Sequence, residues 1–252
     1  MKSCLINPVG LSPMIITELY RYLRNTEKDL RDVVIIHTNS RDVISGSKVA
    51  VASILTHYED ARVQLKPLSS DDIRSSDDLY DFLRTVVDIM QEERDKYKVK
   101  RFYLNATGGR KIQTIALSIF AGILGISEVY NIVDQNVQNV NEQWERERHE
   151  ADNFYGIDST DELKNMYIKL GEEFDSLFYP DVNTLEFIKV PVIIMPEEER
   201  NYLKKLIVGI SIDDEDCSIS KLRAYQESGL ITFDKNRTYG TELGGILLNY
   251  IR

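Results

Sequence analysis

The chain has 252 residues, of which 42% are hydrophobic and 29% are charged, and this composition excludes collagen-like, low-complexity and disulfide-rich classes. Its formal net charge of −10 opposes general binding to duplex nucleic acid. The longest apolar stretch, residues 115–126, is shorter than the roughly 18 residues that a membrane span needs, so we expect no membrane partner.

The cysteines and histidines show none of the spacings that bind metals. Cys4 and Cys217 lie far apart and form no CxxC pair, which indicates a reducing compartment. The N-terminus lacks the basic-then-apolar pattern of a signal peptide. We therefore expect a cytoplasmic protein. The three histidines, His37, His57 and His149, share no ligand spacing, and we predict neither a metal nor a cofactor.

Strand-like runs rich in β-branched residues alternate with helical patterns in the first half of the chain. The predicted strands are Ser3–Val9, Val33–Thr38, Val63–Leu68, Arg101–Asn105 and Glu128–Val133. The predicted helices are Ser12–Arg24, a helix through Val49–His57, Leu79–Tyr97 and Ile112–Leu124. Strict alternation of strand and helix predicts an α/β fold with a parallel, three-layer sheet of Rossmann type over residues 1–134.

The pattern changes in the next part of the chain. Residues 135–158 are rich in Asn and Gln and then carry a mixed charge run around the only tryptophan, Trp144. A flexible linker, a helix and an ordered loop near the site all remain open there. We expect a helix over Asp161–Phe178, so that residues 135–180 form a linker and a connecting helix. A further strand is predicted at Val190–Met195, between proline-containing turns.

Residues 181–252 have a separate signature. The predicted order is two helices, a hairpin and a final helix: Glu197–Val208, Ser218–Ser228, strands Leu230–Phe233 and Thr238–Thr241, and the last residues. This order is typical of a winged-helix-like domain. From Glu197 onward there are 8 Lys and Arg against 10 Asp and Glu, and the acidic run 213–216 directly precedes the second helix. The negative excess disfavours reading of DNA and favours a dimerisation or lid role.

Two strand-to-helix loops carry the strongest chemical signal, Gly10–Pro13 and Asn105–Lys111. Free backbone N–H groups and the positive end of a helix favour an anion at such a junction, usually phosphate. The second loop has two adjacent glycines, followed by Arg110 and Lys111. A pair of glycines also simply makes a tight turn, and that interpretation stays open. Neither GxxxxGK[ST] nor a GxGxxG after the first strand is present, which disfavours a P-loop enzyme and a nicotinamide dehydrogenase.

Ser12 has two compatible interpretations. It is a suitable N-cap for the first helix, with Pro13 at the first helical position. Its hydroxyl is also expected at the carboxyl end of the sheet, where open α/β folds bind ligands.

Together, a first strand ending in Gly-Leu-Ser-Pro, a fourth ending in Asn-Ala-Thr-Gly-Gly-Arg-Lys and a C-terminal winged-helix pattern resemble CARF-domain proteins of type III CRISPR systems. An acidic chain of this length without an appended nuclease domain resembles the stand-alone CRISPR ring nucleases of the first family. The resemblance covers essentially the whole chain. It implies a homodimer that binds cyclic tetra-adenylate and cleaves it, without metal, to linear di-adenylate with a 2′,3′-cyclic phosphate. The alternative is a CARF winged-helix regulator that senses the ring without cleaving it.

The resemblance also implies roles for individual residues. Ser12 would position the ribose 2′-OH or the phosphate, and Arg110 would contact phosphate. Lys169, on the helix after residues 135–158, is the third implied catalytic residue, although helical patterning alone is equally typical of a solvated lysine. The other expected ligand contacts lie in the two loops and at strand ends: Gly10, Leu11, Pro13, Asn39, Asn105, Thr107, Gly108, Gly109 and Lys111.

Overall fold

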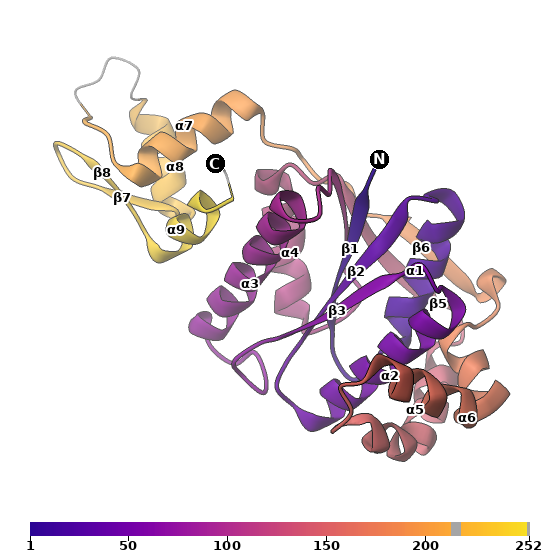
Figure 1. Ribbon diagram of the computed structural model, residues 1–252. Coiled ribbons are helices and arrows are strands. Elements are labelled where there is room, and N and C mark those ends of the chain that lie inside the picture. The colour runs from indigo at the N-terminus through magenta and orange to yellow at the C-terminus, as the bar shows by residue number, and fades with distance from the viewer. Residues whose placement is uncertain (213–217, 251–252) are drawn as a thin grey trace.

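The computed structural model describes residues 1–212 and 218–250, and a six-stranded sheet lies at its centre (Figure 1). The strands stand in the order β3-β2-β1-β4-β5-β6. The first five are parallel, and β6 runs antiparallel to β5. Their bounds are β1 (Ser3–Val9), β2 (Leu30–His37), β3 (Arg62–Pro67), β4 (Arg101–Asn105), β5 (Glu128–Asp134) and β6 (Leu185–Lys189).

Helices cover both faces of this sheet (Figure 1). On one face lie α3 (Ser76–Asp95) and α4 (Lys111–Leu124). On the other lie α1 (Met14–Thr26), α2 (Arg41–His57), α5 (Val137–Ala151) and α6 (Thr160–Phe178). The predicted three-layer α/β fold is therefore confirmed, with the addition of one antiparallel edge strand.

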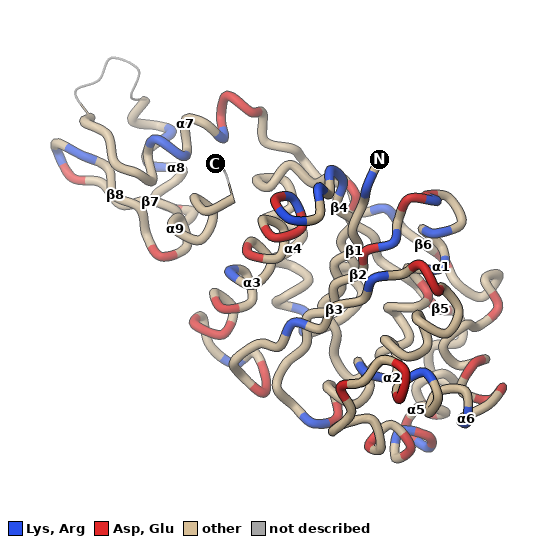
Figure 2. Tube along the Cα trace, viewed as in Figure 1, with Lys and Arg blue, Asp and Glu red and all other residues tan. Residues whose placement is uncertain are grey.

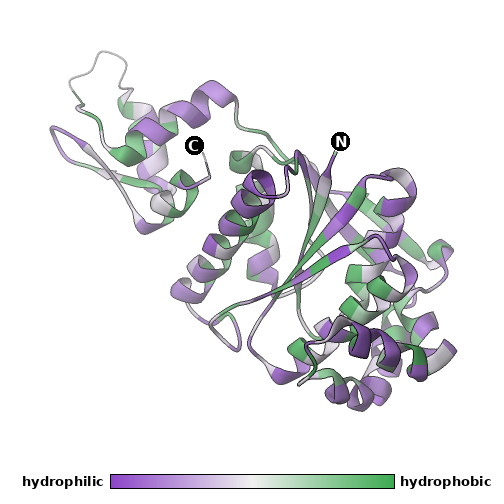
Figure 3. Cartoon of the chain, in the orientation of Figure 1, coloured by the Kyte–Doolittle hydropathy of each residue, from purple (hydrophilic) through white to green (hydrophobic). Residues whose placement is uncertain are grey.

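The sequence of the inner strands explains why both faces are covered. In β1, Cys4 and Ile6 belong to the core under α3 and α4, whereas Leu5 and Val9 belong to the core under α1 and α2. All seven residues of β1 are buried. A strand with apolar side chains on both sides is stable only between two helical layers. Figure 3 shows apolar residues in these central strands and on the inner sides of the helices.

The strand predicted at Val190–Met195 is wrong. These residues are irregular and lie across α4, where the Met195 N–H donates to the Gly122 carbonyl oxygen at 3.0 Å. A Cβ atom on Gly122 would overlap the Ile193 carbonyl oxygen. The segment is thus apolar because part of it packs against a helix, and the strand forms just before it, as β6. The segment 181–252, predicted as the C-terminal domain, therefore contributes β6 to the central sheet.

Residues 135–158, for which three interpretations were open, form α5 followed by a short 3₁₀ turn at Asp152–Phe154. This helix lies on the same side of the sheet as α2 and α6 (Figure 1). No helix of the described residues is long and apolar enough to cross a membrane.

The last elements form a small unit beyond α3 and α4 (Figure 1). They are α7 (Glu197–Val208), α8 (Ile219–Glu227), β7 (Ile231–Phe233), β8 (Thr238–Gly240) and α9 (Glu242–Leu248), in the predicted order. Arg84 of α3 pairs with Glu242 at 3.1 Å, which attaches this unit to the sheet domain. Figure 2 shows both signs of charge along it. Cys217 and the acidic run 213–216 lie outside the described residues.

Candidate functional site

The two loops singled out in the sequence meet at one place in the fold. The chain leaves β1 toward β2 and β3, then returns to β4 on the other side of β1, so the strand order reverses between β1 and β4. Open α/β sheets bind ligands at such a reversal, outside the carboxyl ends of the strands. Gly10 follows β1, and a Cβ atom built on it would lie 3.7 Å from the Gly109 Cα atom of the loop after β4. The candidate site therefore lies where the two loops touch.

The second loop is held from the protein interior. Asn105 is fully buried, and its amide group donates to Asn7 Oδ1 at 3.0 Å and to the Ile15 carbonyl oxygen at 3.1 Å. Its own Oδ1 accepts from the Thr107 N–H at 2.9 Å. The Thr107 hydroxyl in turn accepts from the Ile132 N–H at 2.7 Å. Asn105 therefore shapes the loop from below.

Both glycines of this loop are required by its geometry. A Cβ atom on Gly108 would overlap the Pro8 carbonyl oxygen and Ile15 Cδ1. Gly109 has a φ of +77°, in the left-handed region that L side chains rarely adopt. The tight-turn interpretation of the glycine pair is thus correct, and the turn also leaves the loop backbone close to Gly10.

Two cations stand at the end of this loop. Arg110 is exposed, and its guanidinium group binds both carboxylate oxygens of Asp72, at 2.6 and 2.7 Å. This pair raises the pKa of Arg110 and lowers the pKa of Asp72. Lys111 is exposed and begins α4. Asp72 therefore holds Arg110 where both residues line the larger cavity.

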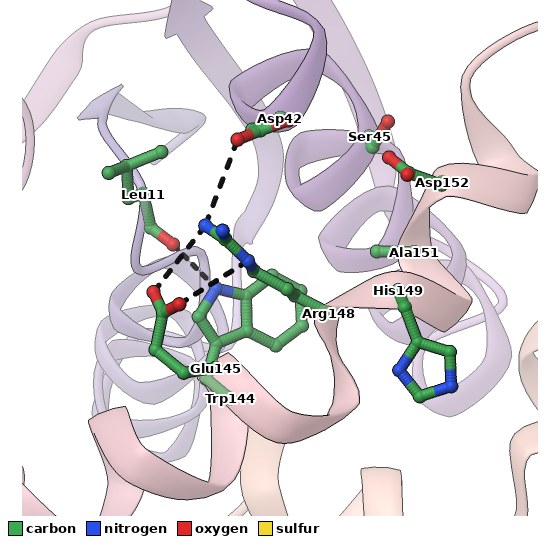
Figure 4. A pocket seen from close by; sticks show the side chains of 9 residues that line it. All are labelled: Leu11, Asp42, Ser45, Trp144, Glu145, Arg148, His149, Ala151 and Asp152. Carbon is green, nitrogen blue, oxygen red and sulfur yellow. Dashed lines mark hydrogen bonds and ion pairs between the residues drawn. The ribbon is translucent and has the colours of Figure 1, made fainter.

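The first loop is held from outside, by α5. The Ser12 hydroxyl donates to Asn141 Oδ1 at 3.3 Å. The Trp144 indole N–H donates to the Leu11 carbonyl oxygen at 2.7 Å (Figure 4). The predicted N-cap role of Ser12 is wrong: α1 begins at Met14 and is preceded by a Pro13 N-cap without a side-chain capping bond. The Ser12 hydroxyl instead bonds to Asn141 of α5.

Further contacts fix α5 itself. The Trp144 ring packs edge-on against Phe178 of α6, with centroids 5.9 Å apart. Arg148 lies between Asp42 at the start of α2, at 3.7 Å, and Glu145 of its own helix, at 3.3 Å (Figure 4). The position of Ser12 thus depends on a helix that lies about 130 residues later in the chain.

Two cavities flank the contact between the loops. One has a volume of about 240 Å³ and the other about 690 Å³, and Gly10, Leu11 and Gly109 line both of them. Ser12, Thr107 and Gly108 line only the smaller cavity. Asn39 and Arg110 line only the larger one. Most of the residues expected to bind the ligand are therefore brought together.

Four expected site residues line neither cavity: Pro13, Asn105, Lys111 and Lys169. Lys111 stands next to Arg110 at the start of α4, and Pro13 completes the first loop. Lys169 is exposed on α6 and does not reach either cavity.

Sequence reasoning missed a buried carboxyl group in the smaller cavity. Glu18 of α1 is only 3% exposed. Burial and the nearby Asp134 carboxylate raise the pKa of Glu18 to about 7, against a smaller opposing effect of Arg21. The available signal was an acidic residue four positions after Met14, on the apolar side of the helix. No group of three or more His, Cys, Asp or Glu side chains in the described part of the chain is placed to hold a metal ion.

The chain is similar to proteins of known families. The chain is 26% identical over 187 residues to the CRISPR system ring nuclease SSO2081 of Saccharolobus solfataricus. The aligned region covers 73% of this chain and 97% of that protein. Among solved structures, Csm6 of Enterococcus italicus bound to cyclic hexa-2′-fluoro-hexa-dAMP has a TM-score of 0.47 and 14% identity, over 82% of this chain and 46% of that one. The chain thus spans less than half the length of that Csm6.

The family comparison covers most of the sequence. The model of the CRISPR-associated protein NE0113 family matches residues 12–223, a range that includes Ser12 and the whole second loop. The resemblance predicted from the two loops is therefore confirmed, and the chain belongs to the CRISPR-associated NE0113 family.

Proposed function

We propose that the protein is a cytoplasmic ring nuclease that binds cyclic tetra-adenylate where its two loops meet and cleaves it to linear di-adenylate with a 2′,3′-cyclic phosphate. Such cleavage switches off type III CRISPR signalling. The observation that carries the proposal is that Gly10 and Gly109 line the same two cavities, because this combines two phosphate-type loops into one site. The ring nuclease of Saccharolobus solfataricus, related over nearly its whole length, supports the reaction class.

The proposed chemistry needs few groups from the protein. The 2′-oxygen of a ribose attacks the neighbouring phosphorus, the bond from phosphorus to the 5′-oxygen breaks, and the proton of the 2′-OH ends on that 5′-oxygen. Two such cuts on opposite sides of the ring release two dinucleotides. Because the nucleophile belongs to the ligand, the protein has to hold it in line with the leaving group and to stabilise the charge on phosphorus.

The residues of the site fit these two tasks. In the proposal, the Ser12 hydroxyl orients the 2′-OH or the phosphate, and loop N–H groups together with Arg110 and Lys111 stabilise the pentacoordinate phosphorus. The Asp72 carboxylate binds the Arg110 guanidinium group in the free protein. In the proposal, a ligand phosphate competes with this carboxylate for the guanidinium group. Lys169 keeps its proposed catalytic role on the resemblance alone and requires a second copy of the chain or a movement of α6 to reach the ring.

The surface beside the site supports a homodimer. Ile112, Ile115 and Ile119 of α4 are 44%, 54% and 63% exposed, directly after the two cations. Residues at this spacing share one helix face, and an exposed apolar face marks an interaction surface. A second copy is the proposed occupant, because a ring of four equal nucleotides has the two-fold symmetry that an isologous dimer provides. Ile115→Glu should give monomers by light scattering, whereas Val182→Glu, at an exposed site after α6, should not.

The reaction is tested by incubating the pure protein with cyclic tetra-adenylate in excess EDTA and identifying the products by liquid chromatography and mass spectrometry. The proposal predicts linear di-adenylate with a 2′,3′-cyclic phosphate. An intact ring that binds tightly would favour the alternative of a sensor whose output lies in the C-terminal unit. An intact ring that does not bind would contradict both functions.

A further inference from the structure

The smaller cavity beside the loops has a composition that the proposed phosphate chemistry does not explain. Its volume of about 240 Å³ is below the roughly 300–1,000 Å³ of pockets for drug-sized ligands, so it accommodates one flat ring system and not a whole tetranucleotide. Apolar side chains form much of its wall: Met14, Ile15, Ile132, Val137 and Val140. Its polar side chains are those of Ser12, Thr107, Glu18, Asp134 and Asn141.

Glu18 is the unusual member of this set. Its side chain is almost fully buried, and the residue lines the cavity. Burial among apolar side chains disfavours the charged form of a carboxyl group. A ligand that enters the cavity would meet this carboxyl group beside apolar walls.

The charges around Glu18 come from two elements. Asp134, at the end of β5, raises its pKa, and Arg21, three residues further along α1, lowers it, while burial has the largest effect. The cavity residues of α5 and of the second loop are uncharged: Val137, Val140, Asn141, Thr107, Gly108 and Gly109. The pKa of about 7 means that the carboxyl group is largely protonated in slightly acidic solution and largely ionised in slightly basic solution.

We propose that this cavity is the subsite for one adenine of the ring and that the protonated Glu18 carboxyl group reads its Watson–Crick edge. This inference rests on the proposed function and adds a base-recognition site to it. Adenine presents an amino donor beside a ring-nitrogen acceptor, and a protonated carboxyl group offers the matching acceptor and donor. Guanine presents two adjacent donors, N1–H and N2–H₂, and these match the two acceptor oxygens of an ionised carboxylate. The apolar walls would contact the two faces of the base.

The subsite is connected to the reaction centre through Asn141. This residue lines the cavity, and its Oδ1 atom accepts the hydrogen bond from the Ser12 hydroxyl. A base in the cavity therefore lies against the group that holds Ser12. Correct base recognition and correct placement of Ser12 then depend on the same side chain.

The test measures binding of cyclic tetra-adenylate with 2′-O-methyl riboses, which lacks the attacking hydroxyl groups, by calorimetry at about pH 6 and pH 8. Wild-type protein should bind about tenfold more tightly at pH 6, because the protonated fraction of a group with a pKa of about 7 falls about tenfold over this range. Glu18→Gln keeps a donor and an acceptor at every pH, so it should bind equally at both. Glu18→Ala should bind at least about tenfold more weakly than wild type at pH 6.

Glu227→Gln, an exposed acid on α8, is the matched control and should bind as wild type does. Thermal unfolding of each variant establishes that it is folded. Equal binding by wild type and Glu18→Ala at both pH values would overturn the subsite and leave the proposed function intact. Weak binding by Glu18→Ala with no pH effect in wild type would overturn the role of the protonated form. No binding of the ring by wild type would remove the proposed function and this inference together.

Discussion

The two loops of the site resemble each other in sequence position but are held in opposite ways. The loop after β4 is fixed from the interior, through buried Asn105 and two glycines that no other residue can replace without a clash or strain. The loop after β1 is fixed by a separate helix, through a bond from Ser12 to Asn141 and a bond from Trp144 to Leu11. The first arrangement makes the loop part of the core. The second lets the Ser12 loop be altered without unfolding the protein.

The largest expected effect is a difference in stability between substitutions in the two loops. Gly108→Ala should lower the free energy of unfolding by about 3 kcal/mol or more, because the added methyl group overlaps the Pro8 carbonyl oxygen and Ile15. Gly10→Ala is the control: its Cβ atom would meet Gly109 at an ordinary contact distance of 3.7 Å, and its stability should change by less than about 0.5 kcal/mol. Urea unfolding measures both. Equal losses would show that the two loops are held alike.

A second effect is the pH dependence of stability that comes from Glu18, in the helix after the first loop. The pKa of Glu18 is about 7 in the folded protein against 4.5 as its ordinary value, so the folded state binds this proton more tightly than the unfolded state does. Stability from this group is therefore present below about pH 4.5 and is lost as the pH rises through 7. Relative to wild type, Glu18→Gln should gain about 3 kcal/mol between pH 4.5 and pH 8, measured by urea unfolding. Glu227→Gln should show no such trend, and a flat Glu18→Gln difference would contradict the assignment.

Ser12→Ala tests whether the loop after β1 acts in the reaction. Cleavage of cyclic tetra-adenylate in a single turnover should slow by about 10²-fold or more, with a smaller change in ring affinity, as expected for a group that acts on the transition state. Ser220→Ala, at an exposed position on α8, should cleave at the wild-type rate. Lys169→Ala is expected to slow cleavage more than binding. Near-normal rates for Ser12→Ala and Lys169→Ala would remove both assignments.

Trp144→Phe should have a smaller effect on cleavage, because it removes the bond to the Leu11 carbonyl oxygen and part of a buried ring but keeps an aromatic ring against Phe178. We expect a loss of about 1–3 kcal/mol in stability and a several-fold slower single-turnover cleavage. Tyr155→Phe, at an exposed residue beyond the end of α5, serves as the control. A cleavage rate unchanged by Trp144→Phe would show that α5 does not position the Ser12 loop.

The smallest effect is expected on ring binding, from the ion pair between Asp72 and Arg110 of the second loop. Asp72→Asn releases Arg110 from its carboxylate partner, so ring binding should tighten about two- to fivefold, the range that an exposed ion pair supports. Asp77→Asn, in the first turn of α3, should leave the dissociation constant unchanged. Weaker binding by Asp72→Asn would mean that Asp72 orients Arg110 rather than competing for it.

These contrasts also explain what could be predicted from the sequence. The parallel strands and their helices followed from local periodicity, and the second loop followed from its own consecutive residues. The contacts of Ser12 with Asn141 and of Leu11 with Trp144 join residues more than 120 positions apart, and one sequence carries no local signal for them. The strand at Val190–Met195 was predicted wrongly because apolar residues that pack against a helix have the same composition as a strand.

A structure of the Ser12→Ala variant with cyclic tetra-adenylate bound in EDTA tests whether the two loops form one phosphate site. We expect a ring phosphate that accepts hydrogen bonds from backbone N–H groups of both loops, residues 10–12 and 107–111. A ring whose phosphates contact only one of the loops, or that binds at the C-terminal unit, would contradict it.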